Sequence, residues 1–156
     1  MKRIAAFLVA LLLLPMFAVS EEVPKPVYDF VTAYNSHANE YAVQPLPLDG
    51  WNYSGVYYNI YLDESLDTSV SIDLIVDHYL ASIIVPPENV NGDFLAVCAC
   101  MTAAIRGESQ SNYADILSAY FALRNAAPGE RITHNTSGGT IILQQEEDLF
   151  LFAVTD

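Results

Sequence analysis

The feature that most constrains the fold is an apolar stretch in the middle of the chain, from Asn91 to Gly107. Apolar side chains recur within it at the spacing of one helix face, at Phe94, Cys98, Met101 and Ile105. Asn91 or Asp93 can cap the start of a helix, and Gly107 stands where helices often end in a left-handed residue. The stretch therefore predicts a buried central helix against which a sheet packs.

The first twenty residues have the pattern of a secretory signal peptide. A short basic start, Lys2 and Arg3, precedes an apolar run over 4–14, and small residues lie at 18–20. The run is shorter than the roughly 20 residues that a membrane-spanning helix needs, so we expect cleavage after Ser20 rather than a retained anchor. The mature chain then consists of a short polar tail, 21–25, and a single α+β domain over 26–156, secreted or held in the cell envelope.

The charge balance is strongly acidic, with 19 Asp and Glu residues against 6 Lys and Arg and a formal net charge of -13. Phosphate binding needs clustered basic residues, so this balance argues against a nucleic-acid partner. It favours attraction to cationic groups such as metal ions, basic peptides and basic protein surfaces, although many exported proteins are simply acidic.

The chain has two cysteines, Cys98 and Cys100. Residues two apart on a helix are rotated by about 200°, so the thiols point away from each other and a disulfide between them would break the helix. Cys98 falls on the apolar stripe and is predicted to be a small buried side chain. We therefore expect replacement of Cys98 by serine to destabilise the protein more than replacement of Cys100. The domain then depends on its hydrophobic core rather than on a disulfide.

Periodicity predicts helices and strands on both sides of the central helix. The expected helices are 26–41 and one that starts at Ser109 or Ser111, and the expected strands are 56–63, 70–77, 79–85, 131–135, 140–145 and 149–154. The order α-βββ-αα-βββ predicts an α+β fold with a mostly antiparallel sheet and helices packed on one face.

Familiar catalytic motifs are absent, among them the serine nucleophile elbow, the phosphate loop and the paired-glycine dinucleotide motif. No set of zinc ligands is visible, so we expect neither a cofactor nor a metal. Asp73 and Asp77 share one face of a strand but lie about 13 Å apart along it, too far for a general acid and its base. A small hydrolase that combines such acids with His37, Glu40 or His78 is the alternative.

The sharpest feature is aromatic, because tyrosines and a tryptophan lead into and along the first predicted strand. Val56 and Ile60 must point to the core, so period two turns Tyr57 and Tyr61 the other way. Tyrosines beside amides and carboxylates can bind a sugar, a peptide or a cationic group. The predicted binding residues are Trp51, Tyr53, Tyr57, Asn59, Tyr61, Asp73 and Asp77. The alternative is that another element, such as the first helix, covers this face.

The sequence therefore predicts an exported, soluble, non-catalytic binding module with a glycan, a basic peptide or a protein as its partner. Two alternatives stay open. One is the small hydrolase described above. The other is a subunit of an envelope assembly, which would present a self-complementary apolar face.

Overall fold

The structure, a computed structural model, describes residues 23–55, 57–63, 68–75, 78–107, 112–127, 129–136 and 139–156. The helices are α2 (Lys25–Ala38), α3 (Gly92–Arg106) and α4 (Asn112–Arg124), with a short 3-10 turn, η2 (Pro87–Asn89), before α3. The strands are β1 (Asn52–Tyr53), β2 (Tyr57–Asp63), β3 (Thr68–Ile75), β4 (His78–Val85), β5 (Arg131–Thr136), β6 (Gly139–Gln145) and β7 (Phe150–Thr155). None of these helices has the length and apolar character needed to span a membrane. The predicted signal peptide lies outside the described residues.

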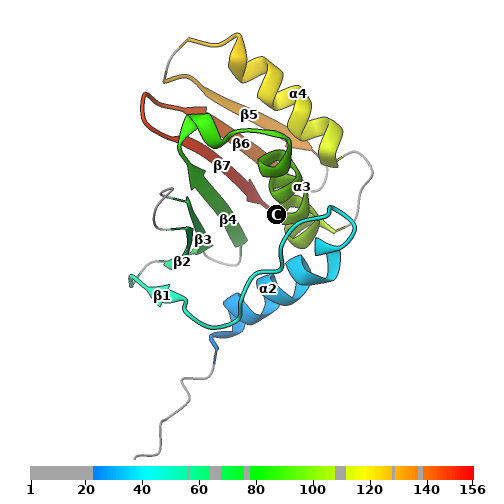
Figure 1. Ribbon diagram of the computed structural model, residues 1–156, viewed down its shortest axis with the longest axis vertical. Coiled ribbons are helices and arrows are strands. Elements are labelled where there is room, and N and C mark those ends of the chain that lie inside the picture. Colours follow the sequence, from blue (N-terminus) through cyan, green and yellow to red (C-terminus); the bar gives the residue numbers. More distant parts are fainter. Residues whose placement is uncertain are drawn as a thin grey trace, which may run out of the picture.

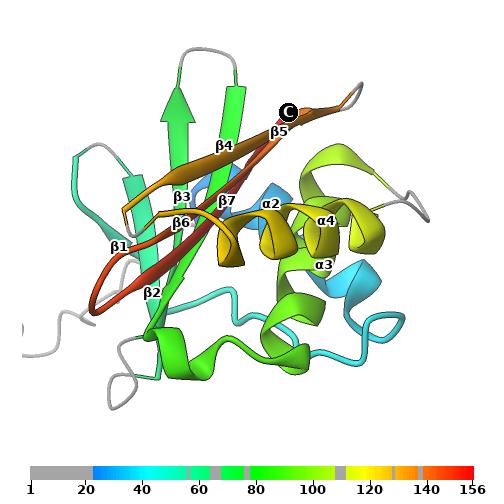
Figure 2. The ribbon, with the colours of Figure 1, turned by 90° about the horizontal axis from the view of Figure 1, so that it is seen from above.

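The strands form one antiparallel sheet in the order β1-β2-β3-β4-β7-β6-β5. β1 to β4 form one meander and β5 to β7 form another, and the two meet where β7 pairs with β4. Helices α2, α3 and α4 lie together on one side of this sheet, as Figures 1 and 2 show. The predicted α+β fold, with an antiparallel sheet and helices on one face, is confirmed.

The register of the strands explains why the helices cover that face. One row of apolar side chains crosses six strands, through Ile60, Val70, Ile83, Phe152, Leu143 and Ile132. Most of the row is buried, and Ile132 at its end packs against the same core. α3 lies over β4 and β7, while α4 lies over β5 and β6. Removing this continuous apolar surface from water is the main driving force for the packing of helices on the sheet.

α3 is the buried helix that the sequence predicts. The side chain of Asn91 caps its start by accepting a hydrogen bond from the backbone N–H of Phe94 at 3.0 Å. Gly107 ends it with a φ of 81°, a conformation that suits glycine. α2, α4 and the sheet surround α3, and Met101 near its middle is fully buried.

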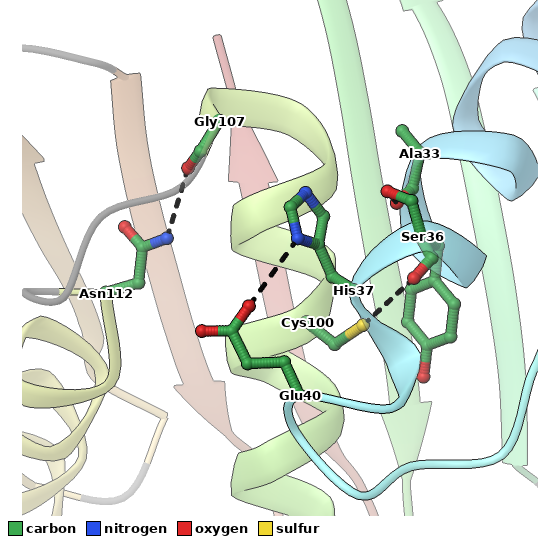
Figure 3. Close-up of polar contacts among 8 residues, drawn as sticks. Ala33, Ser36, His37, Glu40, Cys100, Gly107 and Asn112 are labelled. Carbon is green, nitrogen blue, oxygen red and sulfur yellow. Dashed lines mark hydrogen bonds and ion pairs between the residues drawn. The ribbon is translucent and has the colours of Figure 1, made fainter.

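Both cysteines are fully buried, Cys100 as well as Cys98 of the apolar stripe. A helix enclosed on several sides buries residues that point in different directions, and the Cys100 thiol donates to the Tyr34 carbonyl of α2 at 3.4 Å (Figure 3). Both thiols are free of disulfides. Burial raises the pKa of Cys100 to about 12 and the pKa of Cys98 well above its ordinary value. The thiols therefore stay protonated and serve as packing groups rather than nucleophiles.

α2 starts with prolines and is followed by a left-handed residue. Pro26 lies in its first turn, where a missing N–H costs nothing. Beyond Ala38 the chain turns, because the N–H of Val43 donates to the Ala38 carbonyl at 3.0 Å and Ala42 adopts a φ of 56°. Glycine is the usual residue in such a helix-ending motif. The predicted helix 26–41 is thus shorter than expected at its C-terminal end.

Two details of the first strands differ from the predictions. β1 is an extra strand of two residues, which pairs Asn52 with Asn59 and Tyr53 with Tyr58. Leu62, which the alternation assigns to the core, is 40% exposed. The register shifts between Tyr61 and Asp63, and such a bulge takes a residue out of the alternation of faces.

Candidate binding site

The face of the sheet opposite to the helices is open. Pairing of the strands places three rows of side chains on it: Tyr57, Asp73, Leu80, Thr155, Thr140 and Asn135; Asn59, Ser71, Ser82, Ala153, Ile142 and Thr133; and Tyr61, Ser69, Ile84, Leu151, Gln144 and Arg131. None of the described helices packs on this side of the sheet (Figures 1 and 2). The middle row consists mostly of small side chains, and Ser82, Ala153 and Ile142 within it are buried. We call these rows the open face.

Four of the predicted binding residues lie together on the open face. Tyr57 is 37% exposed and Tyr61 is 54% exposed, with half-buried Asn59 between them on β2. Asp73 of β3 lies directly opposite Tyr57. Directly opposed side chains in an antiparallel pair have Cβ atoms only about 4.5–5.5 Å apart, so the tyrosine ring and the carboxylate are neighbours. Ser71 and Ser69 lie opposite Asn59 and Tyr61 in the same way.

Asp73 carries the negative charge at this end of the open face. The side chain is half-buried, and burial raises the pKa of its carboxyl above the ordinary value. Within the described residues it makes no ion pair that would offset the loss of water. A half-buried carboxylate without a protein partner is well suited to receive a cation from outside.

The structure separates two of the other predicted residues from this group. Tyr53 stacks at a tilt on Tyr58, with ring centroids 4.9 Å apart, and Tyr58 belongs to the helix side of the sheet. Trp51 packs against the core and donates from its indole nitrogen to the Pro47 carbonyl at 3.0 Å. Both therefore lie on the opposite side from Tyr57. Asp77, the remaining predicted residue, lies outside the described residues.

One residue of the open face was missed. Asn52 of β1 pairs with Asn59, so its exposed amide extends the middle row at the edge of the sheet. A strand of two residues is too short to show an alternation of apolar and polar residues. Only its pairing with β2 determines on which side of the sheet each of its side chains lies.

No family model, curated protein or solved structure matches this chain.

Groups that could serve acid–base catalysis are dispersed. His37 and Glu40 lie 3.8 Å apart between Nδ1 and Oε2 at the end of α2 (Figure 3). Cavities of about 280, 410, 690 and 730 Å³ open among the described residues, and their walls contain neither these two residues nor Asp73. None of these cavities therefore brings His37, Glu40 and Asp73 together, which is the combination of described residues that the hydrolase alternative names. The same part of the chain brings no three His, Cys, Asp or Glu side chains together as a metal site.

Arg106 and His134 form a separate polar cluster on the helix side. Asp115 of α4 lies 3.9 Å from Arg106 Nη2 and 3.6 Å from His134 Nε2. The Arg106 side chain is only 6% exposed. This cluster connects α3, α4 and β5, and the sheet separates it from the open face.

Proposed function

We propose that this protein is an exported, non-catalytic binding module that receives a basic peptide on its open face. The observation that carries the proposal is the exposure of Tyr57 and Tyr61 on a sheet face without helices, with Asp73 directly beside Tyr57. Tyrosine rings attract Lys and Arg side chains through their electron-rich faces, and a nearby carboxylate strengthens that attraction. The formal net charge of -13 adds long-range attraction for a basic partner.

A glycan is the second candidate. Ser69 and Ser71 contribute hydroxyl groups beside the tyrosines of β2, and rings with hydroxyl neighbours also suit a sugar. We favour the peptide because Asp73 brings a charge that a neutral sugar does not use. The two candidates differ in one measurable property, since only binding of a basic peptide weakens as salt rises.

The proposal is tested with a peptide and glycan array probed by three proteins: the native chain, Tyr57→Ala/Tyr61→Ala and Tyr28→Ala/Tyr113→Ala. The last variant is a matched control, because Tyr28 is 51% exposed and Tyr113 is 39% exposed, both on helices. We expect basic peptides to bind the native chain and the control equally. Loss of two aromatic contacts should weaken binding by about ten-fold in Tyr57→Ala/Tyr61→Ala.

Circular dichroism of each variant shows whether the sheet is intact. Unchanged peptide binding by a folded Tyr57→Ala/Tyr61→Ala variant would remove the open face from consideration. If binding is confined to the glycan spots and does not depend on salt, the open face is still the binding site, but its ligand is a sugar rather than a peptide.

A further inference from the structure

A second site lies between the chain just after α2, the strand β2 and the first half of α3. Its cavity has a volume of about 730 Å³, within the range of roughly 300–1,000 Å³ usual for small-molecule sites. The segment 41–47 forms one wall, residues 60–62 of β2 another, and Asp93, Ala96 and Val97 of α3 the third. Of the predicted binding residues, Tyr61 is among those that line it, but its pattern in the sequence pointed to the open face.

The wall made by 41–47 is held at several points. The side chain of Asn35 makes two hydrogen bonds with the backbone of Leu46: its Nδ2 donates to the carbonyl at 2.9 Å, and its Oδ1 accepts from the N–H at 2.8 Å. Trp51 donates to Pro47 at the end of the segment. Ala42, at the start, holds a positive φ that a residue with a Cβ rarely adopts. A wall fixed in this way presents a preformed cavity, which lowers the entropic cost of binding.

The cavity combines an apolar lining with a negative charge. Leu46 and Ile60 are buried in its wall, and three tyrosines, Tyr34, Tyr41 and Tyr61, are among its lining residues. Asp93 is the charged side chain among the described residues that line it, and no lysine, arginine or histidine is among them. Burial raises the pKa of Tyr34 above its ordinary value, so that hydroxyl stays neutral.

We infer that this cavity binds a small organic cation: an ammonium group with an apolar body. The ammonium group would lie near the Asp93 carboxylate and the ring of Tyr41, as cations do beside aromatic side chains. The apolar body would lie against Leu46, Ile60 and Val97. An anion would meet the Asp93 charge with no basic residue in the lining to offset it, so charge decides between the two classes. This function is independent of the peptide site, although Tyr61 touches both.

The test compares three soluble probes with one hexyl tail: hexyltrimethylammonium, hexanol and hexyl sulfonate. Binding to the full chain is followed by calorimetry and by amide chemical shifts. We expect saturable binding of the cation, with shifts centred on 41–47 and the start of α3, and much weaker binding of the other two probes. Asp93→Asn should weaken binding of the cation by about five-fold, the effect of one charge or ring contact, and Tyr41→Leu should do the same.

Two variants serve as controls. Asp49→Asn removes an exposed charge outside the lining, and Tyr57→Ala removes a ring of the open face; both should bind the cation like the native chain. Asp93 is also in the first turn of α3, so urea denaturation of Asp93→Asn checks that the fold is kept. Equal binding of cation and sulfonate, no saturable binding, or full binding by folded Asp93→Asn would each overturn the inference. Loss of binding in Tyr57→Ala alone would place the cation on the open face instead.

Discussion

The charged carboxyl of Asp73 lowers the stability of the folded protein but would favour the binding of a cation. Its carboxyl is half-buried beside Tyr57 and lacks an ion pair among the described residues, so the folded protein disfavours its charged form. Carboxyl groups kept in such settings often belong to binding sites, because an incoming cation supplies the missing partner. In the protein without a bound partner, the charged Asp73 should therefore cause a measurable loss of folding stability.

Replacement of this carboxyl should show a stabilisation that depends on pH. Burial raises the pKa of Asp73 in the folded protein above that in the unfolded chain. Between the two pKa values the folded state holds a proton that the unfolded state has released, so stability falls as the pH rises through this window. We expect Asp73→Asn to be more stable than the native protein at neutral pH and to differ little below the ordinary pKa of aspartic acid.

Urea denaturation at the two pH values provides the measurement, and Asp148→Asn, in an exposed turn, is the control. An Asp73→Asn variant whose stability relative to the native protein is the same at neutral and at acid pH would contradict this account.

At the scale of elements, the start of β6 depends on a glycine. Gly139 has a φ of 135°, and a Cβ built on it would lie 2.0 Å from the Thr155 carbonyl oxygen of β7. Gly139→Ala should therefore destabilise the protein by about 2 kcal/mol or more, because both the backbone conformation and the close contact are lost. Gly92→Ala, at the first residue of α3, is the matched control, since a Cβ there meets nothing within 4 Å. Chemical denaturation of the pair checks this, and equal stabilities would show that the β6–β7 contact relaxes easily.

The elements that could be predicted from the sequence are those whose evidence is local. α3 has its cap, its apolar face and its closing Gly107 within one stretch, and the alternation along β2 correctly separates Tyr57 from Ile60. The bulge that exposes Leu62 depends on pairing with β3, which no local pattern contains. The same is true of the burial of Cys100, whose thiol contacts α2, a helix more than sixty residues earlier in the chain.

The candidate site was predictable to a similar extent. Tyr57, Asn59 and Tyr61 lie on one strand, so their common face follows from period two. Trp51 and Tyr53 precede a turn, and the direction in which the chain leaves that turn decides their side of the sheet. The cavity beside 41–47 joins three distant segments, and only the packed chain brings them together.

At the scale of the whole molecule, the strongest expectation concerns its N-terminus. If residues 1–20 direct export and are then removed, the secreted protein should have the mass of a chain whose first residue is Glu21. Ala18→Phe places a large side chain where the peptidase requires a small one, so this variant should accumulate as a precursor that begins at Met1. Mass spectrometry of both proteins measures the outcome. Recovery of the native chain with Met1 intact in the membrane fraction would show a retained anchor.

The place of β7 in the sheet has a consequence for how the protein forms. β7 comes after every other strand in the chain, yet it lies between β4 and β6, near the middle of the sheet. Each meander can form from strands that are near one another in the sequence. Joining the two meanders requires β4 to pair with β7, which lies about seventy residues further along the chain. Pairings over such long separations are slow, because closing the intervening loop costs entropy before any contact forms. The sheet therefore stays in two unjoined parts until β7 has been synthesised. If the chain is exported, this delay keeps it from folding before it crosses the membrane.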